Sequence, residues 1–197
     1  MVFAFEPLPE TFRRLQNNLA FNEFANVSAI PLALSDHCGE EIFHINPDNE
    51  GESSLIGTKN STACRVKVST LDTCFAEGFR QRPRLMKLDV EGVELRVLQG
   101  GQKFFADCAP DVVFCEINCG ALTAGGASEL ALRNFFIERG YHCAVINNGI
   151  RDGLAIGNGQ FYRYLKPSEN SARANYDYVY NLMFVREDTG LFPLAML

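Results

Sequence analysis

Several features that would place this chain in a specialised class are missing from its sequence. No stretch approaches the roughly 18 apolar residues of a membrane-spanning helix, and the first residues show no signal-peptide pattern. The 7 cysteines are odd in number and include no C-x-x-C pair, which disfavours a disulfide framework and a zinc site. We therefore expect a cytoplasmic protein with reduced cysteines and no membrane partner.

Positively charged residues are fewer than negatively charged ones. The chain has 18 Lys and Arg against 24 Asp and Glu, which gives a formal net charge of -6. A surface that binds nucleic-acid phosphates needs clustered Lys and Arg side chains. The one basic stretch, at residues 80–87, is typical of a solvent-exposed segment that leads into a strand. We therefore expect no nucleic-acid partner.

What is present is the pattern of an ordinary globular domain, with 47% hydrophobic and 21% charged residues. Short apolar runs typical of strands alternate with segments of helical spacing. This alternation predicts an α/β fold with a mostly parallel sheet, in which a last strand is antiparallel to its neighbour at 141–147. The predicted strands are 2–5, 26–36, 41–45, 65–69, 84–88, 111–117, 141–147 and 176–187, and the predicted helices are 9–23, 93–101 and 128–140.

The strand at 41–45 is expected in a hairpin, and the helix at 9–23 has an apolar face. Thr70 is expected to cap a helical turn that starts at Leu71, and Ser128 to cap the helix at 128–140, which ends at Gly140. Gly100 or Gly101 is expected to end the helix at 93–101 in a left-handed conformation.

Acidic residues stand where predicted strands end. Glu6, Asp36, Asp89 and Glu116 each occupy such a position, and in α/β sheets ligands bind beyond the carboxyl ends of the strands. We therefore expect these side chains to line one rim. For Glu6, acceptance of two ribose hydroxyls and a place at the positive N-terminus of the next helix are equally compatible with the spacing.

The segment "LMKLDVEGVELRVLQGG", residues 85–101, joins a buried strand to a helix through two acids and a glycine. Asp89 is expected to cap a helix that begins near Val90, with Glu91 in its first turn and Gly92 allowing close approach. Capping explains one acid. Two acids near Glu116, on the neighbouring strand, indicate a polar pocket for a charged cofactor, a metal ion or proton transfer.

Three segments in this order resemble successive motifs of the FkbM family of S-adenosylmethionine-dependent methyltransferases. They are "VFAFEPLPETFRRLQNNLAFN", "IPLALSD" and "LMKLDVEGVELRVLQGG". The resemblance covers about residues 1–147, followed by a variable insertion at 148–175 and a terminal strand at 176–187. All of 1–197 is therefore assigned to a single FkbM-like methyltransferase domain.

The resemblance implies a Rossmann-like class I methyltransferase sheet and roles for individual residues. Glu6 would hold the ribose of S-adenosylmethionine, and Ser35 and Asp36 would lie beside its adenine. Asp89 would lie near the methionine part of the cofactor or near the methyl acceptor. Glu91 would be structural.

One departure from the family pattern concerns the first strand. The family normally begins with a strand and a glycine-containing loop, whereas this sequence starts at what would be the second strand. We therefore expect a sheet with its first strand missing, either because the chain is a fragment or because another segment fills the gap. The glycine loop at 120–126 lacks dinucleotide spacing and is interpreted as a substrate-side loop.

The function favoured by these residues is methyl transfer to an oxygen of a small molecule or sugar, with Asp89 or Glu116 as the base. The same carboxylates could instead hold a divalent metal ion, although no residue is assigned to a metal site. The alternative is a non-catalytic interaction module that keeps the scaffold. A nicotinamide oxidoreductase is disfavoured because the dinucleotide loop is missing.

Overall fold

The computed structural model describes residues 1–47, 53–57, 61–77, 82–146, 162–167 and 179–191. The chain divides into two compact units, the first formed by residues 1–79 and 96–102 and the second by 80–95 and 103–197. None of the helices in the described ranges is long and apolar enough to cross a membrane. The predicted insertion at 148–175 lies outside the described residues, apart from 162–167, and the single-domain assignment stays a prediction.

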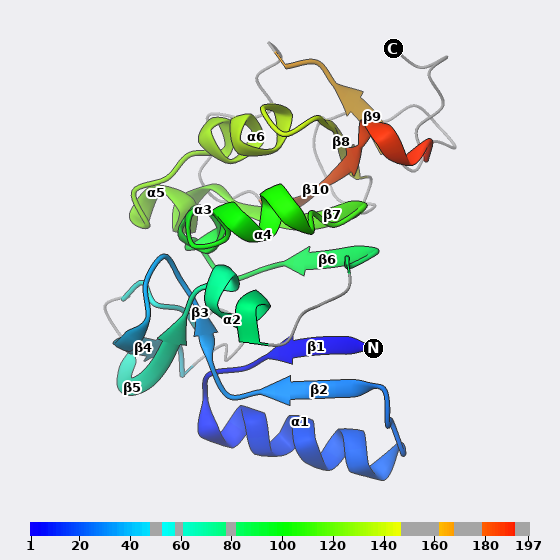
Figure 1. Ribbon diagram of the computed structural model, residues 1–197. Helices are drawn as coiled ribbons and strands as arrows, with labels where there is room; N and C mark the ends of the chain where they lie inside the picture. Colours follow the sequence, from blue (N-terminus) through cyan, green and yellow to red (C-terminus); the bar gives the residue numbers. More distant parts are fainter. Residues whose placement is uncertain (48–52, 58–60, 78–81, 147–161, 168–178, 192–197) are drawn as a thin grey trace. The chain divides into compact units, whose positions relative to one another are not determined.

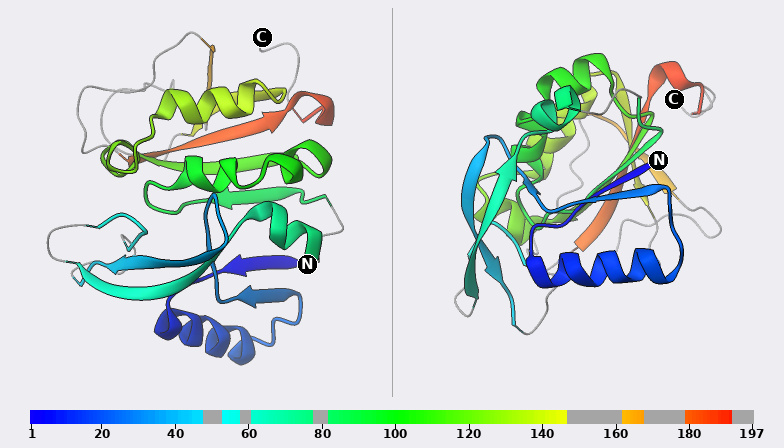
Figure 2. Two further views of the ribbon diagram at one scale, coloured as in Figure 1. Left: turned by 60° about the vertical axis from the view of Figure 1, so that its left-hand side comes forward. Right: turned by 60° about the horizontal axis from the view of Figure 1, so that its bottom comes forward.

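The first unit begins with a strand, a helix and a parallel strand, as predicted. β1 (Val2–Phe5) pairs in parallel with β2 (Val27–Ile30), and α1 (Pro9–Phe21) packs against β2 (Figures 1 and 2). The helix starts at a proline, whose fixed φ suits the first helical position and whose missing N–H is not needed there. The predicted apolar face of α1 is only partly buried, since the helix has no fully buried residue.

A second sheet in the first unit has the order β3-β5-β4. β3 (Ala33–Leu34) runs parallel to β5 (Thr62–Ser69), and β4 (Gly39–Ile45) runs antiparallel to β5, which confirms the predicted hairpin strand. The single strand predicted at 26–36 is wrong. It is divided between β2 and β3, which belong to different sheets, because Pro31 has no N–H for a strand ladder.

The short helix α2 (Leu71–Glu77) follows β5 directly. The Thr70 hydroxyl accepts a hydrogen bond from the backbone N–H of Thr73 over 3.0 Å, which confirms the predicted cap.

The second unit contains a five-stranded sheet with the order β6-β7-β10-β8-β9. Its strands are β6 (Leu85–Leu88), β7 (Val112–Asn118), β8 (Tyr141–Ile146), β9 (Tyr162–Leu165) and β10 (Val179–Arg186). β10 pairs antiparallel with β8, which confirms the predicted last pairing. It also pairs antiparallel with β7, so it lies between two strands that run opposite to it.

The predicted mostly parallel sheet is not found among the described strands. Parallel pairing joins β1 to β2, β3 to β5 and β6 to β7, whereas the pairings of β4 with β5 and of β10 and β9 with their neighbours are antiparallel. The structure is therefore an α/β fold with mixed sheets. Strands that follow one another, such as β4 with β5 and β8 with β9, can pair antiparallel without the crossover that a parallel pair needs, whereas β10 enters between two strands that precede it in the chain.

The remaining helices are α3 (Glu94–Gln99), α4 (Gln102–Asp107), α5 (Cys119–Ala124), α6 (Glu129–Ile137) and the 3-10 turn η2 (Glu187–Thr189). Ser128 caps α6 by accepting a bond from the N–H of Ala131, and Gly140 follows with a φ of +74°, both as predicted. The predicted loop at 120–126 is instead largely helical. Asn118 caps α5 by accepting from the N–H of Ala121.

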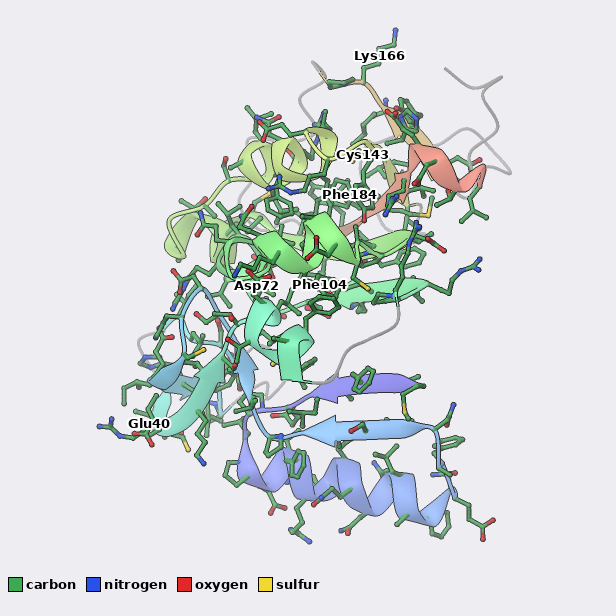
Figure 3. The ribbon with its side chains drawn as sticks, viewed as in Figure 1. Glu40, Asp72, Phe104, Cys143, Lys166 and Phe184 are labelled. Carbon is green, nitrogen blue, oxygen red and sulfur yellow. The ribbon has the colours of Figure 1, made fainter. Side chains whose placement is uncertain are left out.

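Aromatic side chains form the interior of the second unit. Phe136 stacks on Phe184 with ring centroids 4.1 Å apart, and Phe105 meets Phe136 edge to face at 5.8 Å. Figure 3 labels Phe104 and Phe184 of this cluster. Aromatic burial of this kind supplies much of the apolar area that stabilises a sheet with helices packed on it. All seven cysteines are free thiols.

Candidate active site

Glu6 lies directly after β1, where the sequence placed it. Its Oε1 accepts a hydrogen bond from the backbone N–H of Leu8 over 2.8 Å, just before α1 begins. Partial burial raises the pKa of Glu6, and the Leu8 bond partly offsets that rise. Among the described residues no donor is bound to Oε2. Glu6 therefore supports the helix start with one oxygen and has a second oxygen available to a ligand hydroxyl.

Ser35 and Asp36 form a hydrogen-bonded group with Arg96 of α3. The Ser35 side chain is fully buried, and its hydroxyl donates to Asp36 Oδ1 over 3.1 Å and accepts from Arg96 Nη2 over 2.8 Å. Arg96 Nε lies 3.3 Å from Asp36 Oδ1, and its Nη2 lies 2.8 Å from Glu41 Oε2. The group ties the end of β3 to β4 and α3.

The surroundings of Asp36 keep it ionised. A hydrogen bond from His37, the largest cause, together with one from Ser35 and the charge of Arg96 lowers the pKa of Asp36 to about 2, and partial burial opposes this shift. The Asp36 side chain is 42% exposed. The Asp36 carboxylate can therefore contact a ligand, whereas the buried Ser35 hydroxyl helps to hold Asp36 and Arg96 in position.

Gly100 brings α3 close to the same group. A Cβ atom at Gly100 would lie 2.2 Å from the carbonyl oxygen of Ser35, and the Gly100 carbonyl accepts the N–H of Asp72 over 3.0 Å. The predicted left-handed helix end at Gly100 or Gly101 is wrong, because neither glycine has a positive φ. The glycine is required by the close backbone approach.

The second unit brings Asp89 and Glu116 together. β6 and β7 are parallel neighbours with Leu88 opposite Cys115, so the next residues along the two strands are Asp89 and Glu116. Lys87 Nζ lies 2.6 Å from Asp89 Oδ2 and 3.7 Å from Glu116 Oε2. Glu116 lies inside β7, which continues to Asn118, and not at its end as predicted.

Burial and the neighbouring Asp89 raise the pKa of Glu116, while Lys87 opposes that rise. We call Lys87, Asp89, Glu91 and Glu116 the strand-end cluster. Within the described ranges, no three His, Cys, Asp or Glu side chains are grouped so that they could hold a metal ion. A lysine ammonium lies between the two carboxylates that were considered for a metal.

The turn after β6 differs from the prediction. Asp89 does not cap a helix at Val90, because α3 begins at Glu94. Instead the Glu94 carboxylate, only 2% exposed, accepts the N–H groups of Val90 and Gly92, each over 3.1 Å. Asp89 is thereby left to pair with Lys87. The acid that organises the turn is the third one, which sequence reasoning did not single out.

Glu91 is the residue whose importance the sequence understated. Its φ is +51°, in the left-handed region that non-glycine residues rarely adopt, and Gly92 follows with a φ of +100°. Asn118 Nδ2 donates to Glu91 Oε2 over 3.4 Å. Burial, followed by the charges of Asp89 and Glu116, raises the pKa of Glu91 to about 7. Neither the backbone angle nor this environment has a signal in the sequence.

The predicted site residues fall into both units. Glu6, Ser35 and Asp36 belong to the first unit, and Asp89 and Glu116 to the second. The structure brings Ser35 next to Asp36 and Asp89 next to Glu116. The single rim shared by all of them stays a prediction.

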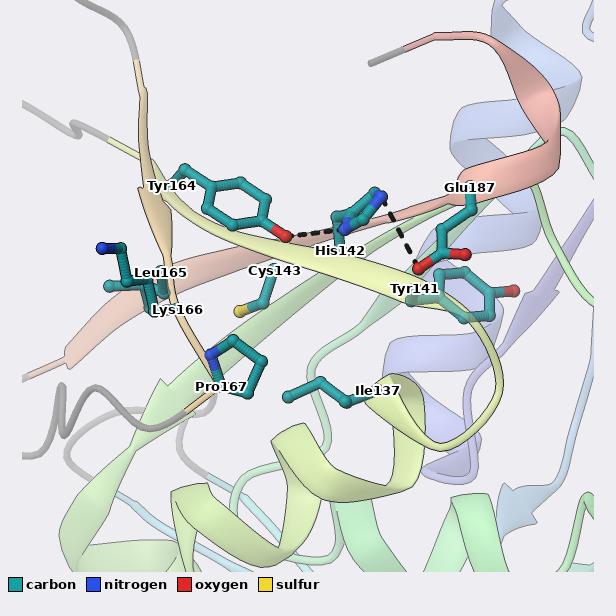
Figure 4. A pocket seen from close by; sticks show the side chains of 9 residues that line it. All are labelled: Ile137, Tyr141, His142, Cys143, Tyr164, Leu165, Lys166, Pro167 and Glu187. Atoms are coloured by element: carbon teal, nitrogen blue, oxygen red, sulfur yellow. Dashed lines mark hydrogen bonds and ion pairs between the residues drawn. The ribbon is translucent and has the colours of Figure 1, made fainter. Parts of the chain in front are cut away.

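A separate hollow of about 500 Å³ lies beside β8 and β9 in the second unit (Figure 4). In it His142 Nδ1 lies 2.6 Å from the Tyr164 hydroxyl and His142 Nε2 lies 3.7 Å from Glu187 Oε1. The hollow contains none of the predicted site residues. Its lining residues are Ile137, Tyr141, His142, Cys143, Tyr164, Leu165, Lys166, Pro167 and Glu187.

Comparison with known proteins decides the family. The model of the methyltransferase FkbM domain matches residues 1–143. The chain belongs to the FkbM methyltransferase domain family. The matched range includes all five predicted site residues.

One relative and one solved structure illustrate what this FkbM domain is similar to. The hexuronic acid methyltransferase AglP of Haloferax volcanii is 37% identical over 101 residues, which are 50% of this chain and 40% of that protein. The crystal structure of the methyltransferase FkbM from Methylobacillus flagellatus KT has a TM-score of 0.53 at 15% identity, covering 93% of this chain and 36% of the other. The similarity to the Methylobacillus flagellatus structure shows that the two chains share a fold. The FkbM domain thus spans about 40% or less of the length of these relatives.

Proposed function

We propose that this chain is an S-adenosylmethionine-dependent methyltransferase that methylates an oxygen of a sugar or a related small molecule. The observation that carries the proposal is the FkbM family match over residues 1–143. S-adenosylmethionine supplies an electrophilic methyl group on a sulfonium sulfur. The chain's own residues would bind and orient the reactants and accept a proton.

The residues of the first unit fit the nucleoside part of this cofactor. Glu6 keeps Oε2 available after its bond to Leu8, as a ribose hydroxyl requires. Asp36 is exposed enough to meet the adenine, and Ser35 and Arg96 hold it in place. We propose Glu6 as the ribose acceptor and Ser35 with Asp36 as the adenine side of the site.

The strand-end cluster of the second unit supplies the acidic groups for the reacting end. Asp89 would lie beside the methionine part of the cofactor or the acceptor, and Asp89 and Glu116 are proposed as catalytic carboxylates. No metal ion is assigned to them. The acceptor is proposed to be a sugar because the relative AglP is named as a hexuronic acid methyltransferase.

We also propose that the fold is of the Rossmann-like class I methyltransferase type. Support comes from two parallel pairs, β1 with β2 and β6 with β7, each joined along the chain through helices. A cytoplasmic location is proposed as well, supported by seven free thiols.

Isothermal calorimetry with S-adenosylmethionine on the 197-residue chain tests the proposal, with Glu6→Gln as the variant and the exposed Glu10→Gln as the matched control. Loss of hydrogen bonds to a charged acceptor is expected to weaken binding about tenfold or more in Glu6→Gln only. Transfer of labelled methyl groups to a uronic acid and to a neutral sugar identifies the acceptor class. A chain that binds no cofactor and transfers no methyl group would favour the interaction module instead.

A further inference from the structure

We propose that Glu91 is the proton acceptor for the hydroxyl that is methylated, and that Asp89 and Glu116 adjust it. This inference rests on the proposed function, and it changes the assignment of the base within the strand-end cluster. It is carried by the position of Glu91 in the turn after β6, beside Asn118 of β7, and by the backbone conformation in which that turn holds it.

The backbone holds Glu91 in an unfavourable conformation. A φ of +51° in a residue with a side chain costs on the order of 1 to 3 kcal/mol, which a glycine would avoid. The turn is held in this form from outside Glu91, because the Glu94 carboxylate binds the N–H groups on either side of it, at Val90 and Gly92. These bonds fix the backbone of the turn and therefore the position from which the Glu91 side chain extends.

Groups on three elements face the Glu91 carboxylate. Asn118 of β7 donates to its Oε2 over 3.4 Å and fixes its direction. The charges of Asp89 after β6, Glu116 of β7 and Glu94 of α3 all disfavour its ionised form. Lys87 Nζ lies 2.6 Å from Asp89 Oδ2 and 3.7 Å from Glu116 Oε2, so its ammonium group is held beside those two carboxylates.

Half-burial together with these neighbours raises the pKa of Glu91 to about 7. A general base works best when its proton affinity is matched to the working pH. Among the acids of the cluster, Glu91 meets this condition near neutrality, where about half of it is ionised and ready to accept a proton.

In the reaction, Glu91 takes the hydroxyl proton while the acceptor oxygen forms its bond to the methyl carbon. The bond between that carbon and the sulfonium sulfur breaks, and its electron pair stays on the sulfur as a neutral thioether. One proton is thus transferred to the carboxylate, and the methylated acceptor is neutral at the new ether oxygen.

The test compares Glu91→Gln, Glu91→Asp and the exposed Glu138→Gln in the 197-residue chain. Glu91→Gln is expected to lower kcat at least about a hundredfold with unchanged cofactor affinity, and Glu91→Asp to retain part of the activity. Thermal unfolding is the readout that does not depend on activity. At pH 8 the melting temperature of Glu91→Gln is expected to rise by about 2–4 °C, because a charge next to two like charges is removed.

The outcomes separate the two proposals. An unsubstituted chain that transfers methyl groups, with a Glu91→Gln variant of equal kcat, overturns the role of Glu91 and leaves the proposed function in place. A Glu91→Gln variant that loses activity but is also less stable indicates a structural residue and likewise overturns the role. If the unsubstituted chain neither binds S-adenosylmethionine nor transfers a methyl group, the proposed function fails and the role fails with it.

Discussion

The carbonyl oxygen of Ser35 lies 2.2 Å from the place that a Cβ atom at Gly100 would occupy. No side chain can be accommodated at this distance from a backbone atom without moving either β3 or α3. Because the neighbouring Ser35 hydroxyl binds both Asp36 and Arg96, such a movement would disturb the acidic group of the first unit as well.

We therefore expect Gly100→Ala to lower the free energy of unfolding by about 3 kcal/mol or more. Gly140→Ala is the control, since that glycine has open space around it and only its φ of +74° opposes a side chain, at about 1 kcal/mol. Urea denaturation of both variants measures the difference. Equal losses would show that the close approach to Ser35 does not constrain the fold.

Asp36→Asn is expected to change how the free energy of unfolding depends on pH in the acid range. The folded-state pKa of Asp36 is about 2, below its ordinary value of 3.8, so its contribution is present above pH 4 and is lost as the pH falls through 2. Because the side chain is largely exposed, the loss in the variant at pH 7 should be under about 1 kcal/mol. Urea midpoints between pH 2 and 7 should converge at the acid end, and a constant gap would contradict the assignment.

Glu91→Gln should have the opposite dependence on pH. The pKa of Glu91 is raised from 4.5 to about 7, so the stability associated with its protonated form is fully present below pH 4.5 and is lost as the pH rises through 7. The variant cannot ionise. We expect it to equal the unsubstituted chain at pH 4 and to be more stable by about 1 kcal/mol at pH 8, after allowance for solvent screening.

Guanidinium titrations at several pH values measure this difference. Glu138→Gln, on an exposed helix end, is the control and should follow the unsubstituted chain throughout. A Glu91→Gln variant whose stability runs parallel to that of the unsubstituted chain from pH 4 to 8 would show that Glu91 has no raised proton affinity.

Lys87→Met should weaken the second unit at neutral pH. The substitution removes the cation that lies 2.6 Å from Asp89 and 3.7 Å from Glu116 and leaves two neighbouring carboxylates without their counter-charge. For a partly exposed pair the expected loss is about 1 kcal/mol, and it should shrink at acid pH because Glu116, whose pKa is raised, takes up a proton. Lys67→Met on β5 is the matched control. Thermal melts at pH 5 and pH 8 provide the measurement.

Much of the local structure could be predicted because it depends on neighbours in sequence. Thr70 and Ser128 have hydroxyls that reach backbone N–H groups three residues on, and these caps are where the sequence indicated. The strand, helix and strand at the start follow from periodicity in the same way. The break at Pro31 could also have been read from the sequence, since the missing N–H is a local property.

The candidate site could be predicted only in part. The acids at strand ends, Glu6 and Asp89, are where the pattern placed them. Which acid organises the turn after β6 could not be read from the segment, because Asp89, Glu91 and Glu94 are all acids close to a helix start. The choice depends on which side chain is buried beneath the turn, and that is Glu94.

Short-range spacing and residue type were enough to predict the alternation of strands and helices, the caps at Thr70 and Ser128, and the family. The folded chain was needed to establish that β10 lies between β7 and β8, that the Ser35 carbonyl confines Gly100, and that Glu91 is held at a positive φ among like charges. The physical reason is that sheet order, close backbone contact and proton affinity depend on groups far apart in the chain, whose proximity exists only after folding.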